Sequence, residues 1–159
     1  AVFHVLAHSL TKTLMFFGAG NVIQKYRTRE MKDIKGLGRT MPATAALLVL
    51  GGAAIAGSPP FAIFIGELFI ISGALAQGDY LVAGIFIALI VIIFAGMTYR
   101  VFGMVSGRPQ EGLPDGEIGR LRLLPMALLA AAILVLGLVL PEAISDALGA
   151  VVELFGVSA

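Results

Sequence analysis

Apolar segments of roughly bilayer length, separated by short polar segments, constrain the fold of this chain more than any other feature. A helix needs about 20 mostly apolar residues to cross the ~30 Å hydrocarbon core of a membrane. Four segments meet or approach this length, at residues 1–23, 43–76, 81–104 and 123–140. We therefore predict an all-α integral membrane protein, in which residues 1–159 form a single membrane domain with four transmembrane helices.

The composition excludes several classes of soluble protein. Hydrophobic residues make up 58% of the chain and charged residues 13%, against roughly 45–50% and 25% in soluble domains. So few charged side chains cannot cover a globule of this size, which argues against a soluble enzyme. The formal net charge of +1 provides no basic field to attract phosphates, so we expect no nucleic acid partner. The chain has no cysteine for a disulfide or a thiolate metal site.

The second apolar segment, residues 43–76, needs a decision between two topologies. As one straight helix it would be about 50 Å long, which is too long for one crossing. It is interrupted by four helix-breaking residues: Gly57, Ser58, Pro59 and Pro60. A single broken span places the basic loops 24–41 and 105–122 on one side of the membrane, whereas a hairpin would separate them. Because cytoplasmic loops carry the excess of Lys and Arg, we predict a single broken span with both loops in the cytoplasm.

The ends of the predicted helices have features of a membrane surface. The three tyrosines, Tyr26, Tyr80 and Tyr99, lie near predicted helix ends, where interfacial aromatic side chains prefer to sit. Beyond Pro141, residues 142–156 have apolar side chains at helical spacing with acidic side chains between them. We predict a C-terminal amphipathic helix over 142–156 that lies on the membrane surface, on the side opposite the basic loops.

Ionisable side chains within the first span are candidate functional residues. His4, His8 and Lys12 follow one another at intervals of four residues, so we expect them along one helix face, with neighbouring Cβ atoms about 5–6 Å apart. Because histidine titrates near neutral pH, we interpret the row as a proton path. The alternative is that Lys12 extends to a membrane surface and the histidines are packing residues. The spacing of His4 and His8 would allow a zinc site, but no carboxylate lies near them in the sequence, so we predict no metal site. We also expect no bound cofactor.

Glu67 is the other ionisable residue expected deep in the membrane, seven residues after Pro60. Pro59 and Pro60 have no N–H group, so carbonyls of the preceding turn lose their helical partners. Unwound backbone is tolerated in a membrane only where protein buries it or where it lines a wet cavity. Broken helices beside charged groups recur at ion sites of transporters, so we predict that Glu67 belongs to the proton path. The alternative is a packing kink with a structurally satisfied glutamate.

Two motifs carry a resemblance to a known family. One is His4-x3-His8-x3-Lys12, continuing as TLMFFGAGNVIQKYRTREMKDIKGLGRTMP, and the other is AGSPPFAIFIGELFI. They resemble a late transmembrane helix and the following broken helix of antiporter-like membrane subunits. That family includes the proton-pumping subunits of respiratory complex I, Mrp-type cation/proton antiporters and subunits of membrane-bound nickel–iron hydrogenases. The sequence of these motifs is most similar to that of hydrogenase-4 component F.

The resemblance implies a larger subunit of about fourteen helices, of which this chain would be the C-terminal third. The start at Ala1 instead of Met agrees with a piece of a longer polypeptide. The resemblance places Lys12, with His4 and His8, on the family's channel, and Glu67 on its broken-helix position.

The implied function is translocation of protons, with Na⁺ as the other candidate ion, in a redox-driven complex of the prokaryotic inner membrane. Such complexes include membrane-bound hydrogenase, formate hydrogenlyase and NADH-quinone oxidoreductase. The partners would be the other membrane subunits of the complex and the lipid bilayer, and the chain would hold no redox centre of its own. The alternatives are an Mrp-type antiporter subunit and a purely structural membrane scaffold.

Overall fold

The computed structural model describes residues 2–139, 146 and 149–150, and the regular structure among residues 2–139 is entirely helical. The all-α prediction is therefore confirmed. The amphipathic helix predicted over 142–156 lies for the most part outside the described residues. The elements, in chain order, are α1 (Val2–Tyr26), η1 (Met31–Asp33), α2 (Leu37–Thr40), α3 (Pro42–Ile55), α4 (Ala62–Ala76), α5 (Tyr80–Val105), η2 (Arg120–Arg122) and α6 (Leu123–Leu138).

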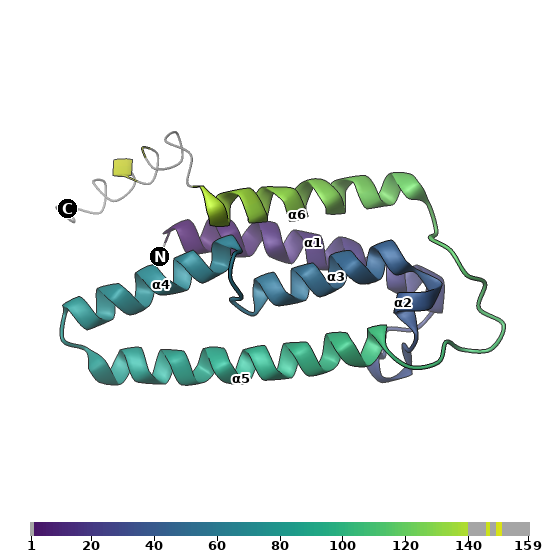
Figure 1. Cartoon of the computed structure of the whole chain (residues 1–159), viewed down its shortest axis with the longest axis horizontal. Helices are drawn as coiled ribbons and strands as arrows, with labels where there is room; N and C mark the ends of the chain where they lie inside the picture. The colour runs from purple at the N-terminus through teal and green to yellow at the C-terminus, as the bar shows by residue number, and fades with distance from the viewer. Residues whose placement is uncertain (1, 140–145, 147–148, 151–159) are drawn as a thin grey trace.

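The long helices lie side by side along one axis. The chain runs along this axis in alternating directions, through α1, then α3 and α4 together, then α5, and then α6 (Figure 1). α3 and α4 each contact α1, α5 and α6. The interrupted helix pair is therefore the centre of the bundle, and the elements around it are positioned by contact with it.

The predicted break is confirmed, and it is slightly longer than expected. α3 ends at Ile55 and α4 begins at Ala62, so the non-helical backbone includes Gly57–Pro60 and one further residue at each end. α4 continues in the same general direction as α3 and does not fold back on it (Figure 1). α3 and α4 therefore form one interrupted helix and not a hairpin of two short helices.

The end of α3 is closed by a specific turn. Gly57 has φ of +74°, a left-handed conformation that glycine adopts without steric cost. The N–H of Gly57 donates to the carbonyl of Ala54 at 3.2 Å, and the N–H of Ser58 donates to the carbonyl of Ala53 at 3.0 Å. This pair of bonds is a Schellman motif, which satisfies carbonyls that the helix end would otherwise leave without partners.

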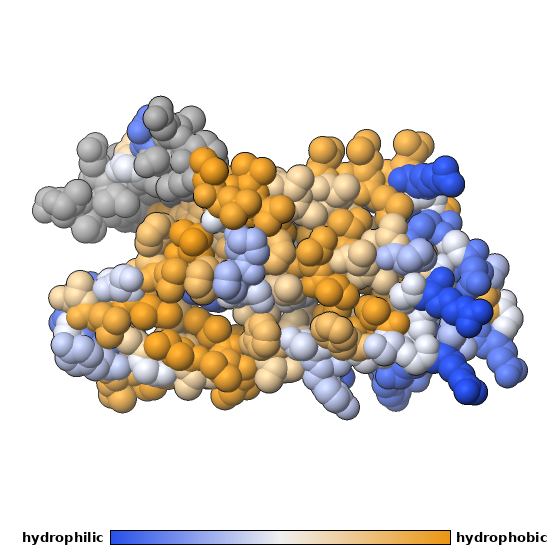
Figure 2. All heavy atoms as spheres, viewed as in Figure 1, coloured by the Kyte–Doolittle hydropathy of each residue, from blue (hydrophilic) through white to orange (hydrophobic). Residues whose placement is uncertain are grey.

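The two basic loops form one hydrophilic end of the molecule. Figure 2 shows hydrophilic residues gathered at the end where both loops lie, while mostly apolar residues cover the long helices. The N–H of Gly36 donates to the carbonyl of Ser106 at 2.9 Å, and the N–H of Gly116 donates to that of Thr40 at 2.8 Å. The Lys25 ammonium also donates to the Gly116 carbonyl at 2.8 Å. The loops therefore share one end of the bundle, as the charge pattern predicts.

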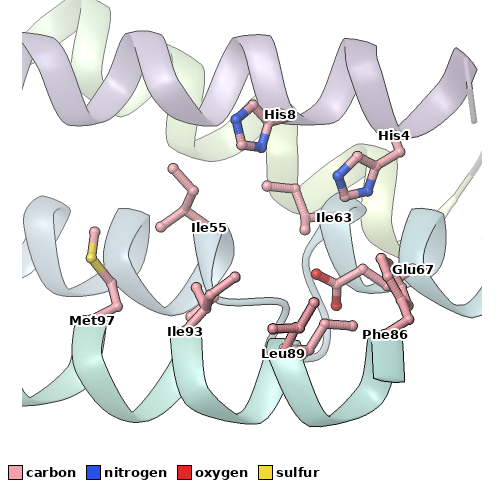
Figure 3. Close-up of a pocket in the computed structure, with 11 residues that line it drawn as sticks. His4, His8, Ile55, Ile63, Glu67, Phe86, Leu89, Ile93 and Met97 are labelled. Carbon is pink, nitrogen blue, oxygen red and sulfur yellow. The ribbon is translucent and has the colours of Figure 1, made fainter. Parts of the chain in front are cut away.

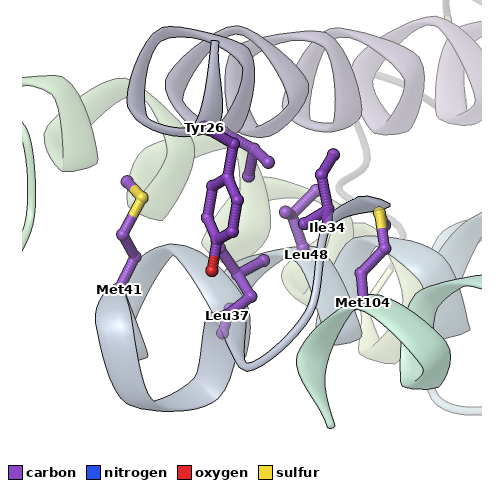
Figure 4. Close-up of a cluster of buried hydrophobic side chains, with 8 residues drawn as sticks. Tyr26, Ile34, Leu37, Met41, Leu48 and Met104 are labelled. Atoms are coloured by element: carbon purple, nitrogen blue, oxygen red, sulfur yellow. The ribbon is translucent and has the colours of Figure 1, made fainter. Parts of the chain in front are cut away.

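Tyr26 differs from the expectation that it sits at the membrane surface. Its side chain is 5% exposed and packs in a cluster with Leu37 and Met41, among others (Figure 4). Its hydroxyl donates to the carbonyl of Lys35 at 2.9 Å and lies 2.8 Å from Thr40 Oγ1. The loop folds back over the end of α1 and supplies these partners, so Tyr26 fixes the loop instead of facing lipid.

A carboxylate from the second loop caps the start of α3. Glu117 accepts hydrogen bonds from the N–H groups of Ala43 and Thr44, at 2.9 and 3.0 Å, and from the Thr44 hydroxyl at 2.5 Å. The first N–H groups of a helix have no partner within the helix, and the helix dipole favours negative charge there. Glu117 therefore joins the hydrophilic end to the broken helix.

Two helical segments of the described chain are long and apolar enough to cross a membrane, Tyr80–Val105 and Arg120–Leu138. α3 and α4 are shorter apolar helices. α5 exposes apolar side chains along its length, including Leu81, Val91 and Ile92. The count of four crossings remains a prediction.

Candidate functional site

A cavity of about 390 Å³ lies where α1, the break after α3, α4 and α5 meet. Three ionisable side chains line it, His4 and His8 from α1 and Glu67 from α4 (Figure 3). The remaining lining is apolar: Ile55, Ala56, Ile63, Phe86, Leu89, Ile90, Ile93 and Met97. The structure thus brings together three of the four ionisable residues predicted for the proton path.

α1 holds the two histidines in a stack. His4 and His8 lie one turn apart, with ring centroids 5.8 Å apart and ring planes inclined by 27°. Both side chains are half-buried. His4 Nδ1 is buried and has no hydrogen-bond partner within the described part of the chain. Buried polar atoms normally have a partner, so this nitrogen marks a place where a water molecule or a moving side chain can bind.

Glu67 is the sixth residue of α4, about one and a half turns from its start, and is 9% exposed. Its carboxylate contacts the backbone of Gly57 so closely that a Cβ atom on Gly57 would overlap Glu67 Oε2. The cavity lining contains no lysine or arginine, so no cation of the described chain faces the carboxylate there. The unwound turn is therefore one wall of the site.

Gly66 brings the two sides of the site together. A Cβ atom at this position would lie 2.9 Å from His4 Cβ and 3.0 Å from His4 Cα, too close for any other residue without movement of a helix. Glycine within a helix costs roughly 0.5–1 kcal/mol relative to alanine. Sequence reasoning placed Gly57 in the helix break but missed its contact with Glu67, and it missed the role of Gly66. The signal that could have revealed Gly66 is a glycine within an apolar helix, directly before the candidate acid.

Lys12 is not part of this cavity. Its side chain is exposed, and it is absent from the lining that includes His4 and His8. The reason is the helix period of 3.6 residues, because each step of four residues rotates the side chain by about 40°. After two steps Lys12 points about 80° away from His4. The described residues therefore give a His–His–Glu site with a lysine on a neighbouring face.

The site has the properties needed to hold and move protons. Histidine accepts and releases protons near neutral pH, and a carboxylate is a second proton acceptor. The cavity is large enough for water, which occupies about 30 Å³ per molecule in the liquid. Within the described residues, no group of three His, Cys, Asp or Glu side chains is arranged to hold a metal ion.

Comparison with known proteins agrees with the resemblance found in the motifs. The family profile described as "NADH:quinone oxidoreductase/Mrp antiporter, TM" matches residues 1–93. A hydrogenase-4 component F homolog of Methylacidiphilum infernorum is 35% identical over 107 residues, which cover 67% of this chain and 22% of the relative. NADH-quinone oxidoreductase subunit N of Desulforudis audaxviator is 30% identical over 163 aligned residues, which cover 92% of this chain and 32% of the relative.

The fold is also that of a solved relative. The Mrp complex of a Dietzia species contains a chain that matches with a TM-score of 0.77 at 23% identity. The match covers 86% of this chain and 34% of the other. This chain therefore spans about a third or less of the length of the relatives it matches. The family match covers more than half of the chain, and the chain belongs to the NADH:quinone oxidoreductase/Mrp antiporter transmembrane family.

Proposed function

We propose that this chain forms the C-terminal third of an antiporter-like subunit that translocates protons, with Na⁺ as the other candidate ion, in a redox-driven complex of a prokaryotic inner membrane. Family membership and relatives named as hydrogenase-4 and NADH-quinone oxidoreductase subunits support this proposal. One observation carries it. His4, His8 and Glu67 share one otherwise apolar cavity at the break of a helix.

The proposed topology has four crossings, by α1, by α3 and α4 together, by α5 and by α6. The common direction of α3 and α4 supports a single crossing by the broken pair (Figure 1). The two basic loops would lie in the cytoplasm, because they share the hydrophilic end and cytoplasmic loops carry the excess of basic residues. Residues 142–156 would then lie on the opposite surface.

In the proposed mechanism, protons pass between α1 and α4 through the cavity. The stacked rings of His4 and His8 exchange a proton through water or by rotation, and Glu67 exchanges a proton with them across the cavity. Lys12 lies one turn beyond His8 towards the hydrophilic end, and it extends the path on the neighbouring face of α1. In the full-length protein, further helices would enclose that face.

The decisive experiment replaces Glu67 by glutamine in the full-length protein within its complex. Glu67→Gln keeps the shape of the side chain and removes its ability to carry a charge. We expect the complex to assemble and the acidification of proteoliposomes, followed with a pH-sensitive dye, to be lost. Glu111→Gln changes an exposed carboxylate of the second loop and is the matched control. If this chain is only a scaffold, the complex should translocate protons normally with either substitution.

The second candidate function is that of an Mrp-type cation/proton antiporter subunit, which the fold similarity to the Mrp complex favours. The two functions differ in what drives transport. An antiporter moves protons in response to a Na⁺ gradient alone, whereas a redox-driven subunit requires an electron donor and acceptor. Proteoliposomes that respond to the Na⁺ gradient without a donor would support the antiporter.

A further inference from the structure

A second cavity lies at the hydrophilic end of the bundle, apart from the histidine–glutamate site. It has a volume of about 350 Å³ and is formed by the first loop and the last turns of α5. Its lining contains three cations, Lys32, Lys35 and Arg100, and no carboxylate. The other lining residues are Met31, Tyr99 and Gly103. The cavity therefore has the charge needed to hold an anion.

Lys35 is held in position across the end of α5. Its ammonium donates a hydrogen bond to the carbonyl of Gly103 at 3.1 Å. An ammonium has three N–H donors, so donors remain for a ligand. Lys32 and Arg100 are exposed on η1 and α5, and both can turn their side chains towards the same anion. Two loop lysines and one helical arginine thus line one cavity and concentrate positive charge there.

The surroundings of the basic cavity are amphipathic. A groove of about 230 Å³ between α1 and α5 shares Met31 with it. Apart from Arg29, the groove is lined by apolar residues such as Phe16, Ile23 and Met97. Tyr99 is 79% exposed, next to Arg100, and the turns of α5 before it expose apolar side chains. Exposed tyrosines at helix ends are typical of the boundary between hydrocarbon and water. A ligand here would meet positive charge on one side and apolar surface on the other.

We propose that this cavity binds the phosphate-bearing headgroup of an anionic phospholipid, with one acyl chain in the adjoining groove. A free phosphate would contact the cations but would not fill the groove. An acidic protein segment would also pair with the cations and leave the groove empty. Basic pockets on the cytoplasmic side of membrane proteins attract anionic lipids in this way. This inference rests on the proposed topology, which places this end of the bundle in the cytoplasm, and it is independent of the proton path.

The test uses the full-length protein, stripped of lipid in detergent and reconstituted with phosphatidylglycerol or phosphatidylcholine. Retained lipid is measured by native mass spectrometry. We expect phosphatidylglycerol to bind in preference to phosphatidylcholine. In the triple variant Lys32→Gln, Lys35→Gln and Arg100→Gln, its affinity should fall by about fivefold per cation removed, or roughly 100-fold in total.

A matched control removes three other exposed cations of the same end of the molecule, in the triple variant Arg39→Gln, Arg108→Gln and Arg120→Gln. It changes the net charge equally and should keep most of the affinity. Equal losses in the two triple variants would reduce the effect to general charge and overturn the proposal, as would equal binding of the two lipids. Displacement of the lipid by millimolar inorganic phosphate would assign the cavity to a free anion. Loss of a protein subunit from the complex, with lipid retention unchanged, would assign it to an acidic protein partner.

Discussion

The contact between Gly57 and Glu67 makes a quantitative prediction about the break. Gly57→Ala introduces two separate costs. A residue other than glycine in the left-handed region costs roughly 1–2 kcal/mol. The new Cβ atom would also overlap Glu67 Oε2, and relief of such overpacking typically costs about 1–3 kcal/mol. We expect Gly57→Ala to lower the free energy of unfolding by about 2–5 kcal/mol and to move the carboxylate out of its position.

The chain offers a matched control for the backbone cost alone. Gly78, in the turn between α4 and α5, has φ of +79°, and a Cβ atom added to it would meet no atom of the described chain within 4 Å beyond its immediate neighbours. Gly78→Ala should therefore cost only about 1–2 kcal/mol. Free energies of unfolding are measured for the full-length protein in mixed micelles titrated with a denaturing detergent, and proton translocation is measured in proteoliposomes. Gly57→Ala should reduce translocation and Gly78→Ala should not.

A double-mutant cycle isolates the contact. In a Glu67→Ala background the carboxylate is absent, so Gly57→Ala should cost no more than Gly78→Ala does. An unchanged cost of Gly57→Ala in that background would refute the overlap with Glu67 as its cause. Equal costs of Gly57→Ala and Gly78→Ala in the otherwise unchanged protein would refute it independently.

Three further predictions concern the hydrophilic end and the proposed path. Tyr26→Phe should lower the free energy of unfolding by about 1–3 kcal/mol, because it removes the hydrogen bonds of the buried hydroxyl with the Lys35 carbonyl and the Thr40 hydroxyl, and denaturant titration measures this. Glu117→Ala should remove the cap of α3, at a cost of about 0.5–2 kcal/mol in the same titration, with Glu111→Ala near zero as its control. Lys12→Ala should abolish proton translocation because it removes the titratable amine. Lys12→Arg should abolish it too, because arginine does not release its proton in proteins. Normal translocation by Lys12→Arg would make Lys12 a fixed countercharge.

The distribution of basic residues and the proline pair were sufficient to predict the main organisation of the chain. The requirement that loops 24–41 and 105–122 share one side of the membrane led to the prediction of a single broken span. In the structure, hydrogen bonds between these loops join them at one end of the bundle. Pro59 and Pro60 located the break because they lack an N–H group. These features are local or depend on summed charge, so they can be recognised without a tertiary structure.

The features that sequence reasoning missed depend on contacts between distant segments. Tyr26 resembles an interfacial aromatic until the loop that buries it is placed. The cap on Thr44 comes from Glu117, 73 residues further along the chain. Lys12 follows His4 and His8 at the same spacing, but two steps of four residues rotate its side chain away from that of His4. That this rotation excludes Lys12 from the site is seen only once the walls of the cavity are known.

The two glycines of the site limit how its parts can move relative to one another. Gly66 packs α4 directly against the backbone of α1 at His4, and Gly57 holds the end of α3 against the carboxylate of Glu67. Backbone contact on both sides of Glu67 opposes a large displacement of α4, because a shift in either direction would separate closely packed atoms. His4 Nδ1, in contrast, has no partner within the described chain, and apart from the two histidines and Glu67 the cavity is lined by apolar residues. For the proposed function, this geometry favours proton transfer by rotation of side chains and by water entering the cavity, while the helices remain a fixed frame.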